Sequence, residues 1–110
     1  MGRTPEGLLP GTLDLLILRV IATGPQHGYG IAQRLKVVSR DVLDVGESSL
    51  YPALQRLLLN GDLDAEWAAS TNNRRARFYR LTRTGRKRLT AEQVSYERMA
   101  AAIGRVLSEA

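Results

Sequence analysis

The first pattern in the sequence is a helical one. Apolar residues recur every three or four positions, at Leu13, Leu16, Ile17, Val20 and Ile21. This is the period of an amphipathic α-helix, and we predict that Thr12 caps it and that the turn TGP at residues 23–25 ends it. After the turn GPQHG, a shorter pattern at residues 29–38 puts Ile31, Ala32 and Leu35 on one face. A second helix is therefore predicted to pack on the first.

The segment SSLYPALQRLLLNG, at residues 48–61, keeps the helical spacing around a proline. Its apolar positions are Leu50, Leu54, Leu57 and Leu58. With Ser49 as the N-cap, Pro52 takes the third helical position, where a backbone N–H has no partner within the helix in any case. The sequence thus predicts a third helix whose outer side presents hydrogen-bonding side chains. These are Ser48, Ser49, Tyr51, Gln55 and Arg56.

Further along the chain the pattern changes to strict alternation. In DLDAEW, residues 62–67, Leu63, Ala65 and Trp67 share one face and acidic residues share the other. This is the period of a half-buried strand, with Trp67 predicted in the core. ARFYRLT predicts a second strand, joined to the first by the polar connection ASTNNRR. From an N-cap at Thr82, one long helix is predicted to the last residue.

This order of elements predicts a mainly α fold with a two-stranded β-hairpin. Three helices, a hairpin and a fourth helix is the order of a winged helix-turn-helix, whose third helix enters the DNA major groove. We expect residues 1–82 to form this domain and residues 83–110 to form a long C-terminal dimerisation helix. The seam expected between two copies consists of Leu89, Tyr96, Met99, Ile103, Val106 and Leu107. The alternative is a helix folded back on its own core.

The distribution of charge suggests a partner. Sixteen basic residues stand against eleven acidic ones, and residues 72–88 hold eight of the basic residues and no acidic one. Segregation at the predicted hairpin favours nucleic acid over a merely solvated surface, because arginines can neutralise phosphates. We predict DNA contacts from the outer side of the third helix and from Tyr29, Asn73, Arg74, Arg75 and Arg77. Core packing is the alternative for Tyr29 and Tyr51.

Two residues of the third helix are candidates for reading bases. Gln55 and Arg56 carry amide and guanidinium groups, which make bidentate contacts to adenine and guanine respectively. Catalysis has no comparable support, because the chain has no cysteine and one histidine, His27, in a glycine-flanked turn. We expect no enzyme activity, no cofactor and no metal site. The longest apolar run is too short to span a bilayer, so no membrane association and a cytoplasmic location are expected.

Three segments resemble PadR-type transcriptional regulators in order and spacing. They are GTLDLLILRVIATGPQHGYGIAQRL, SSLYPALQRLLLNG and NNRRARFYRLTRTGRKRL. The resemblance implies a winged-helix transcription factor, usually a repressor, that dimerises through its C-terminal helix, similar to the compact subgroup with a single such helix. The chain departs from the family pattern in two places: Ser48 replaces a usual glycine, and Leu58 and Leu59 replace common acidic residues.

The function expected from these observations is sequence-specific regulation of transcription. A homodimer is expected to bind a pseudopalindromic operator in double-stranded DNA; the alternatives are a winged-helix protein-interaction module and a non-specific nucleic-acid binder. The resemblance also implies release by a small aromatic effector. We expect room for it near Leu13, Ile17, Tyr96, Met99 and Ile103, unless these residues are filled core.

Overall fold

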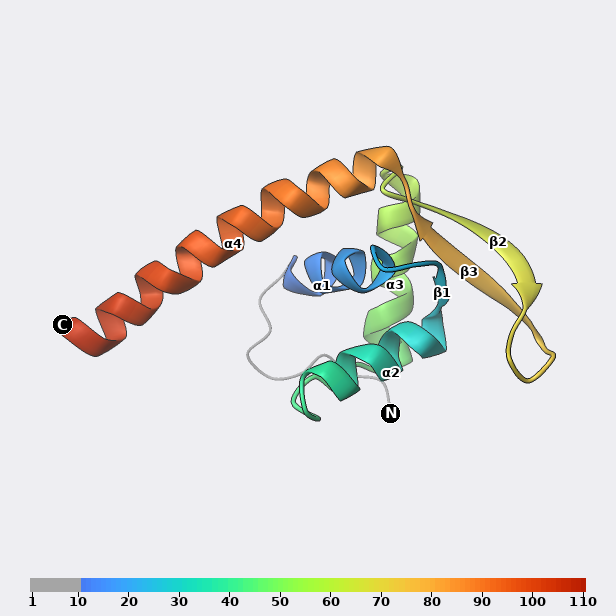
Figure 1. Cartoon of the computed structure of the whole chain (residues 1–110), viewed down its shortest axis with the longest axis horizontal. Coiled ribbons are helices and arrows are strands. Elements are labelled where there is room, and N and C mark those ends of the chain that lie inside the picture. Colours follow the sequence, from blue (N-terminus) through green and yellow to red (C-terminus); the bar gives the residue numbers. More distant parts are fainter. Residues whose placement is uncertain (1–10) are drawn as a thin grey trace.

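The computed structural model describes residues 11–110, so the first ten residues of the expected DNA-binding domain lie outside the described part. The body contains α1 (Thr12–Ile21), α2 (Gly28–Val38) and α3 (Glu47–Leu59), and β2 (Leu63–Ala69) and β3 (Arg75–Leu81) project from it as a hairpin (Figure 1). Helix α4 (Arg83–Glu109) extends from the body as a long arm. The predicted fold, mainly α with a winged helix-turn-helix, is confirmed. None of the helices within residues 11–110 is long and apolar enough to cross a membrane.

The sheet has one strand more than predicted. Gln26 and His27 form β1, which pairs antiparallel with β3 by placing Gln26 opposite Tyr79 and His27 opposite Phe78. The strand order is β1-β3-β2. Two residues are too few to show an alternating pattern, so the sequence GPQHG indicates only a turn. As a result of this pairing, the start of α2 is fixed beside the base of the hairpin.

The hydrophobic core of the described residues lies where the three helices meet the base of the sheet. Its members come mainly from the predicted helical faces, which confirms the three-to-four-residue spacing as the signal that placed them. Leu16, Val20, Ala32 and Leu58 are only partly buried at its edge. The buried members are Leu13, Leu15, Ile17, Leu18, Ile21, Ile31, Leu35, Val45, Leu50, Ala53, Leu54, Leu57, Leu63, Tyr79 and Leu89.

Helix α3 starts earlier than predicted. Its N-cap residue is Gly46, whose carbonyl accepts a hydrogen bond from the Leu50 N–H at 3.0 Å. Ser49 is therefore inside the helix, and Pro52 lies in the second turn, where a residue with an N–H would donate to the carbonyl four residues before it. The predictions that Ser49 is the N-cap and that Pro52 costs no helical hydrogen bond are wrong.

The starts of α1 and α4 contrast with each other. Helix α1 has Gly11 as its N-cap residue and no side-chain cap, so the predicted role of Thr12 is wrong by one position. Helix α4 begins as predicted, because the Thr82 hydroxyl accepts a hydrogen bond from the Gly85 N–H at 3.0 Å. A side-chain cap of this kind satisfies one of the N–H groups that have no partner within the first helical turn.

The first two turns of α4 hold it on the body. Asp62, with 2% of its surface exposed, accepts a hydrogen bond from Arg88 Nη1 at 2.6 Å, and Arg88 Nε donates to Glu92 at 2.7 Å. Gly85 lies so close to the Asp62 carbonyl oxygen that a Cβ at this position would overlap it. Beyond Leu89, α4 has no buried residue. The remaining part of the helix is therefore available to a partner.

Candidate nucleic-acid interface

The outer side of α3 presents polar side chains to solvent. Ser48, Tyr51, Gln55 and Arg56 are exposed, and Ser49 is half-buried. The opposite side of the helix is held by Leu50, Leu54 and Leu57, which are almost completely buried. Because the buried face fixes how the helix is rotated, the outer side chains have a defined place on the surface.

Arg56 has a partner within the chain. Its Nη2 donates a hydrogen bond to Oδ1 of Asp14 at 2.8 Å, and Asp14 lies in α1 with 6% of its surface exposed. Such a charge-assisted pair links α1 to α3 and occupies part of the guanidinium. Contact between Arg56 and a base stays a prediction, whereas the Gln55 amide is exposed on the outer side of α3.

Tyr51 lies across the start of α2. A Cβ at Gly28 would fall 2.6 Å from the Tyr51 phenol oxygen, so the ring can take this position only because residue 28 is glycine. Burial, together with the charges of Glu47 and Tyr79, raises the pKa of Tyr51. The phenol thus stays protonated around neutral pH and can donate a hydrogen bond. This contact joins the HGYG and LYPAL segments.

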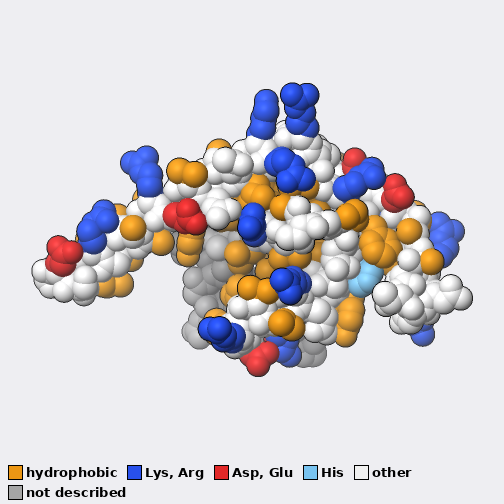
Figure 2. Space-filling model, viewed as in Figure 1, with side chains coloured by type: hydrophobic (Ala, Val, Ile, Leu, Met, Phe, Trp, Pro, Cys, Tyr) orange, Lys and Arg blue, Asp and Glu red, His pale blue; other side chains and the backbone are white. Residues whose placement is uncertain are grey.

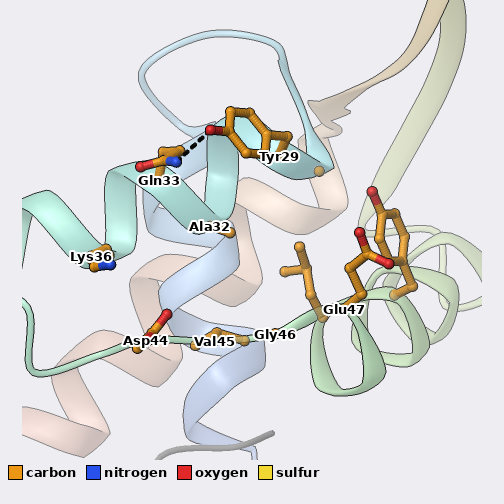
Figure 3. Close-up of a pocket in the computed structure, with 11 residues that line it drawn as sticks. Tyr29, Ala32, Gln33, Lys36, Asp44, Val45, Gly46 and Glu47 are labelled. Atoms are coloured by element: carbon orange, nitrogen blue, oxygen red, sulfur yellow. Dashed lines mark hydrogen bonds between the residues drawn. The ribbon is translucent and has the colours of Figure 1, made fainter. Parts of the chain in front are cut away.

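Two aromatic rings shape the start of α2. His27 is its N-cap, because Nδ1 accepts a hydrogen bond from the Gly30 N–H at 3.0 Å. The His27 ring also meets Phe78 edge-on, with centroids 5.1 Å apart. Tyr29 is 69% exposed, and its phenol oxygen accepts a hydrogen bond from Gln33 at 2.7 Å (Figure 3). His27 therefore serves the helix start, and Tyr29 is not core.

A hollow of about 430 Å³ separates α2 from the loop that leads into α3 (Figure 3). Its rim carries Lys36 from α2, Asp44 from the loop and Glu47 from the first turn of α3. Two carboxylates against one ammonium group give this rim a negative balance, which disfavours phosphate. This hollow is therefore not a favourable binding site for the DNA backbone.

A second hollow, which we call the wing groove, separates the hairpin from the starts of α2 and α3. It has a volume of about 600 Å³, and no acidic residue is among its described lining residues. One wall carries Trp67, Arg75 and Arg77 from the hairpin, and the other carries Tyr29 and Tyr51. In Figure 2 the single histidine, in pale blue, marks this side of the body next to the projecting hairpin. The groove is lined by cationic and aromatic groups together.

The basic run of residues 72–88 does not form a single patch. Arg80 is paired with Asp64 at 3.1 Å and with Glu66 at 3.8 Å, and Arg88 is paired with Asp62. Figure 2 shows lysine and arginine side chains spread along α4 and over the body. Of the eight basic residues in the run, Arg74, Arg75 and Arg77 line the wing groove. The fold therefore places three of these eight basic residues at the wing groove.

Two residues of the hairpin differ in how well the sequence places them. Trp67 is 59% exposed, so the prediction that it belongs to the core is wrong. Strand β2 leaves the body after Ala65, and the alternation continues past the point where other side chains can cover it. Asn73 lies at the exposed tip with φ of 62°, a left-handed conformation that asparagine adopts more readily than most residues.

The exposed apolar stripe of α4 contains all but one of the residues predicted for the dimer seam. Leu89 is 5% exposed and belongs to the core of its own chain, so its assignment to the seam is wrong. Val94, which the expected seam does not include, is 54% exposed and adds to the exposed apolar surface of the helix. The predicted residues that lie exposed are Tyr96, Met99, Ile103, Val106 and Leu107.

The residues expected around an effector are divided between two environments. Leu13 is 7% exposed and Ile17 has no exposed surface, so these two are filled core. Tyr96, Met99 and Ile103 lie on the exposed stripe of α4. A ligand could reach Ile17 only by displacing core side chains. Any effector site built on the remaining three residues would lie along α4.

The chain matches one protein-family model and is similar to several known proteins. The model of the family described as "Transcriptional regulator PadR-like family" matches residues 17–91. A transcriptional regulator from Clostridium thermocellum is similar in structure, with a TM-score of 0.78 and 26% identity over 86% of this chain and 92% of that chain. A PadR family regulator from Eggerthella lenta has a TM-score of 0.76 and 25% identity, covering 91% and 85%. An uncharacterized protein from Lysinibacillus sphaericus is 28% identical over 76% of each chain.

Proposed function

Because this chain belongs to the PadR-like family of transcriptional regulators, we propose that it represses transcription as a homodimer bound to a pseudopalindromic operator. The observation that carries the proposal is that the polar outer side of α3 meets the wing groove at Tyr51. No acidic residue is among the described residues that line this groove. A helix for the major groove and a cationic hairpin beside it are the two contacts that a winged helix makes with a duplex. A cytoplasmic location is part of the same proposal.

Each surface has a separate task in this proposal. Helix α3 enters the major groove and Gln55 contacts a base edge, while Ser48, Ser49 and Tyr51 donate hydrogen bonds to phosphates. Arg74, Arg75 and Arg77 of the hairpin neutralise the neighbouring backbone. The pair of Arg56 with Asp14 supports this arrangement by linking α3 to α1.

The two-fold symmetry of the proposed dimer matches that of a pseudopalindromic operator. The apolar stripe of α4 packs against the same stripe of a second copy, and the two α3 helices then read half-sites about one helical turn, roughly 10 bp, apart. The test is selection of bound duplexes from random DNA with the purified protein, followed by footprinting. Recovery of an inverted repeat with a discrete protected site supports the proposal. Binding without any protected site, or no binding, would instead indicate a non-specific binder or a protein-interaction module.

Substitutions in α3 and in the hairpin are expected to have different effects. Arg75→Ala removes a phosphate contact, so it should weaken binding to all sequences and lower the salt slope by about 1. Gln55→Ala should cost about tenfold on the operator and relax base preference, with little effect on random DNA. Binding measured at several salt concentrations separates the two effects. Arg80→Ala is the control, because it removes the same charge from an arginine already paired with Asp64. Equal losses on operator and random DNA for both variants would contradict these roles.

We propose that an effector binds along the seam, at Tyr96 and Met99. Met99 lines a groove of about 640 Å³ on α4 together with Val94 and Ala102. An effector that releases DNA must bind the DNA-incompetent dimer more tightly than the competent one, because equal affinity shifts nothing. Titrating planar aromatic compounds against the protein–operator complex should reveal compounds that lower operator affinity. Met99→Ala should blunt that response relative to its own operator affinity without compound, because the stripe also forms the dimer. An unchanged response in this variant would exclude the site.

A further inference from the structure

The two faces of the hairpin differ in the charge they present. In the antiparallel register, Trp67 lies opposite Arg77 and Ala69 lies opposite Arg75, and these four residues share one face. The other face carries Asp64 opposite Arg80, with Glu66 as the next acidic residue. The face with Trp67 is the wall of the wing groove. The hairpin therefore turns its cationic face toward the helices and its acidic face away from them.

The arginines of the two faces have different partners. Arg80 is paired with two carboxylates, whose two negative charges outweigh its single positive charge. The Arg75 guanidinium lies over the Trp67 ring, with Cζ 5.5 Å from the ring centroid, and that of Arg77 lies over Tyr79 at 5.9 Å. No ion pair in the described part of the chain involves Arg75 or Arg77. An aromatic face holds a guanidinium in place without neutralising it, so both arginines keep their charge for an anion.

In the expected complex, the wing groove lies over the sugar–phosphate strand between the major and minor grooves of the DNA. Helix α3, with Tyr51, forms one wall and the hairpin forms the other. In a winged-helix complex the helix occupies the major groove and the hairpin reaches the backbone or the adjacent minor groove. Since the two grooves of a duplex are separated by a sugar–phosphate strand, that strand has to pass between the two walls.

We propose that Trp67 is a DNA-contacting residue whose indole forms the hairpin wall of a cradle for one sugar–phosphate strand of the bound duplex. This inference rests on the proposed function. The apolar indole packs against deoxyribose, and Arg75, held on the indole face, bonds the adjacent phosphate. The Tyr51 phenol closes the cradle from the side of α3. Trp67 has to be exposed for this contact, because an indole covered by the body could not touch DNA.

Intrinsic fluorescence tests the contact directly, because Trp67 is the only tryptophan of the chain. The intact protein is titrated with an operator duplex selected by the wild type, and tryptophan emission is followed beside the anisotropy of a labelled duplex. Emission should change in intensity or wavelength along the same binding curve and recover when salt dissociates the complex. Emission that stays constant at saturation would overturn the proposal. A response to single-stranded DNA as large as that to the duplex would also overturn it, since it would indicate base stacking.

Affinity measurements test whether the contact contributes to binding. Trp67→Ala should weaken operator binding about tenfold, and Trp67→Phe should recover part of that loss because a phenyl face still holds Arg75. The double variant with Arg75→Ala should lose less than the sum of the two single losses, because the two side chains act together. Combination of Trp67→Ala with Arg80→Ala, on the opposite face, should be additive. Additive losses in the first pair, or wild-type affinity in Trp67→Ala, would overturn the proposal.

Two controls separate this inference from its premises. The thermal unfolding midpoint of Trp67→Ala should match that of the wild type, because the side chain is largely exposed; a large fall would assign the loss of binding to folding and count against the contact. If the wild type protects no discrete site, the proposed function itself fails. If it protects a site, but Trp67 emission does not change on binding and Trp67→Ala binds the operator like the wild type, only the inference about Trp67 fails.

Discussion

Removal of residues 91–110 is expected to leave a folded monomer that binds the operator at least about a hundredfold more weakly than the intact protein. The truncation keeps Gly85, Arg88 and Leu89, which are the residues that anchor α4 to the body. It removes the exposed apolar stripe, on which the second copy is proposed to pack. Two half-sites read by one linked dimer bind far more tightly than either alone, and this advantage disappears in a monomer.

A point substitution provides a milder form of the same experiment. Ile103→Arg keeps the whole helix and places a charge on the stripe, where Ile103 is 48% exposed in the single chain. Sedimentation should show the wild type as a dimer at micromolar concentration and the variant as mainly monomer, with affinity for random DNA little reduced. A wild type that sediments as a monomer, or a truncated chain with full operator affinity, would contradict the dimer.

Arg88→Met is expected to lower the free energy of unfolding by about 3 kcal/mol. The Asp62 side chain is 3% exposed, and Arg88 is its ion-pair partner. Hydrogen bonds with Glu92 and Asp62 raise the pKa of Arg88, because both carboxylates favour its charged form. Methionine retains much of the aliphatic stem but leaves the Asp62 carboxylate buried without its counter-charge. The expected value is at the lower end for a broken buried pair because 32% of the Arg88 side chain is exposed.

The matched control is Arg80→Met, which breaks an ion pair on the exposed face of the hairpin. Both carboxylates there remain hydrated after the substitution, so the loss of stability should be much smaller than for Arg88→Met. Urea unfolding should be measured for both variants at one protomer concentration, because association of a dimer adds to apparent stability. Similar midpoints for the two variants would show that the Asp62–Arg88 pair does not fasten α4 to the body.

The sequence predicts the helices and the hairpin because their signals are local. The spacing of Leu50, Leu54 and Leu57 specifies a buried face whatever it packs against, and the Thr82 hydroxyl needs only its own first turn to act as a cap. The sequence does not identify the N-cap of α3, because serine at 49 and glycine at 46 are both acceptable N-cap types. The choice between them depends on how the preceding loop meets the body.

The sequence does not predict contacts between distant elements. Alternation placed Trp67 on the same face as Leu63, but only the length of the body determines that Leu63 is covered and Trp67 is exposed. Likewise, Leu89 has the spacing of the seam but lies close enough to the body to join the core. The partner of Arg56 is 42 residues away at Asp14, and nothing local to either residue indicates the pair.

The contact between Gly28 and Tyr51 makes the two positions interdependent during evolution. Alanine at 28 would meet the far end of a movable ring, so the fold would tolerate it while the phenol would be pushed out of the cradle. A small residue at 51 would free the space and make position 28 permissive. The fitness effect of a change at one position is therefore set by the residue at the other, and geometry dictates the order in which a lineage can accept the two changes.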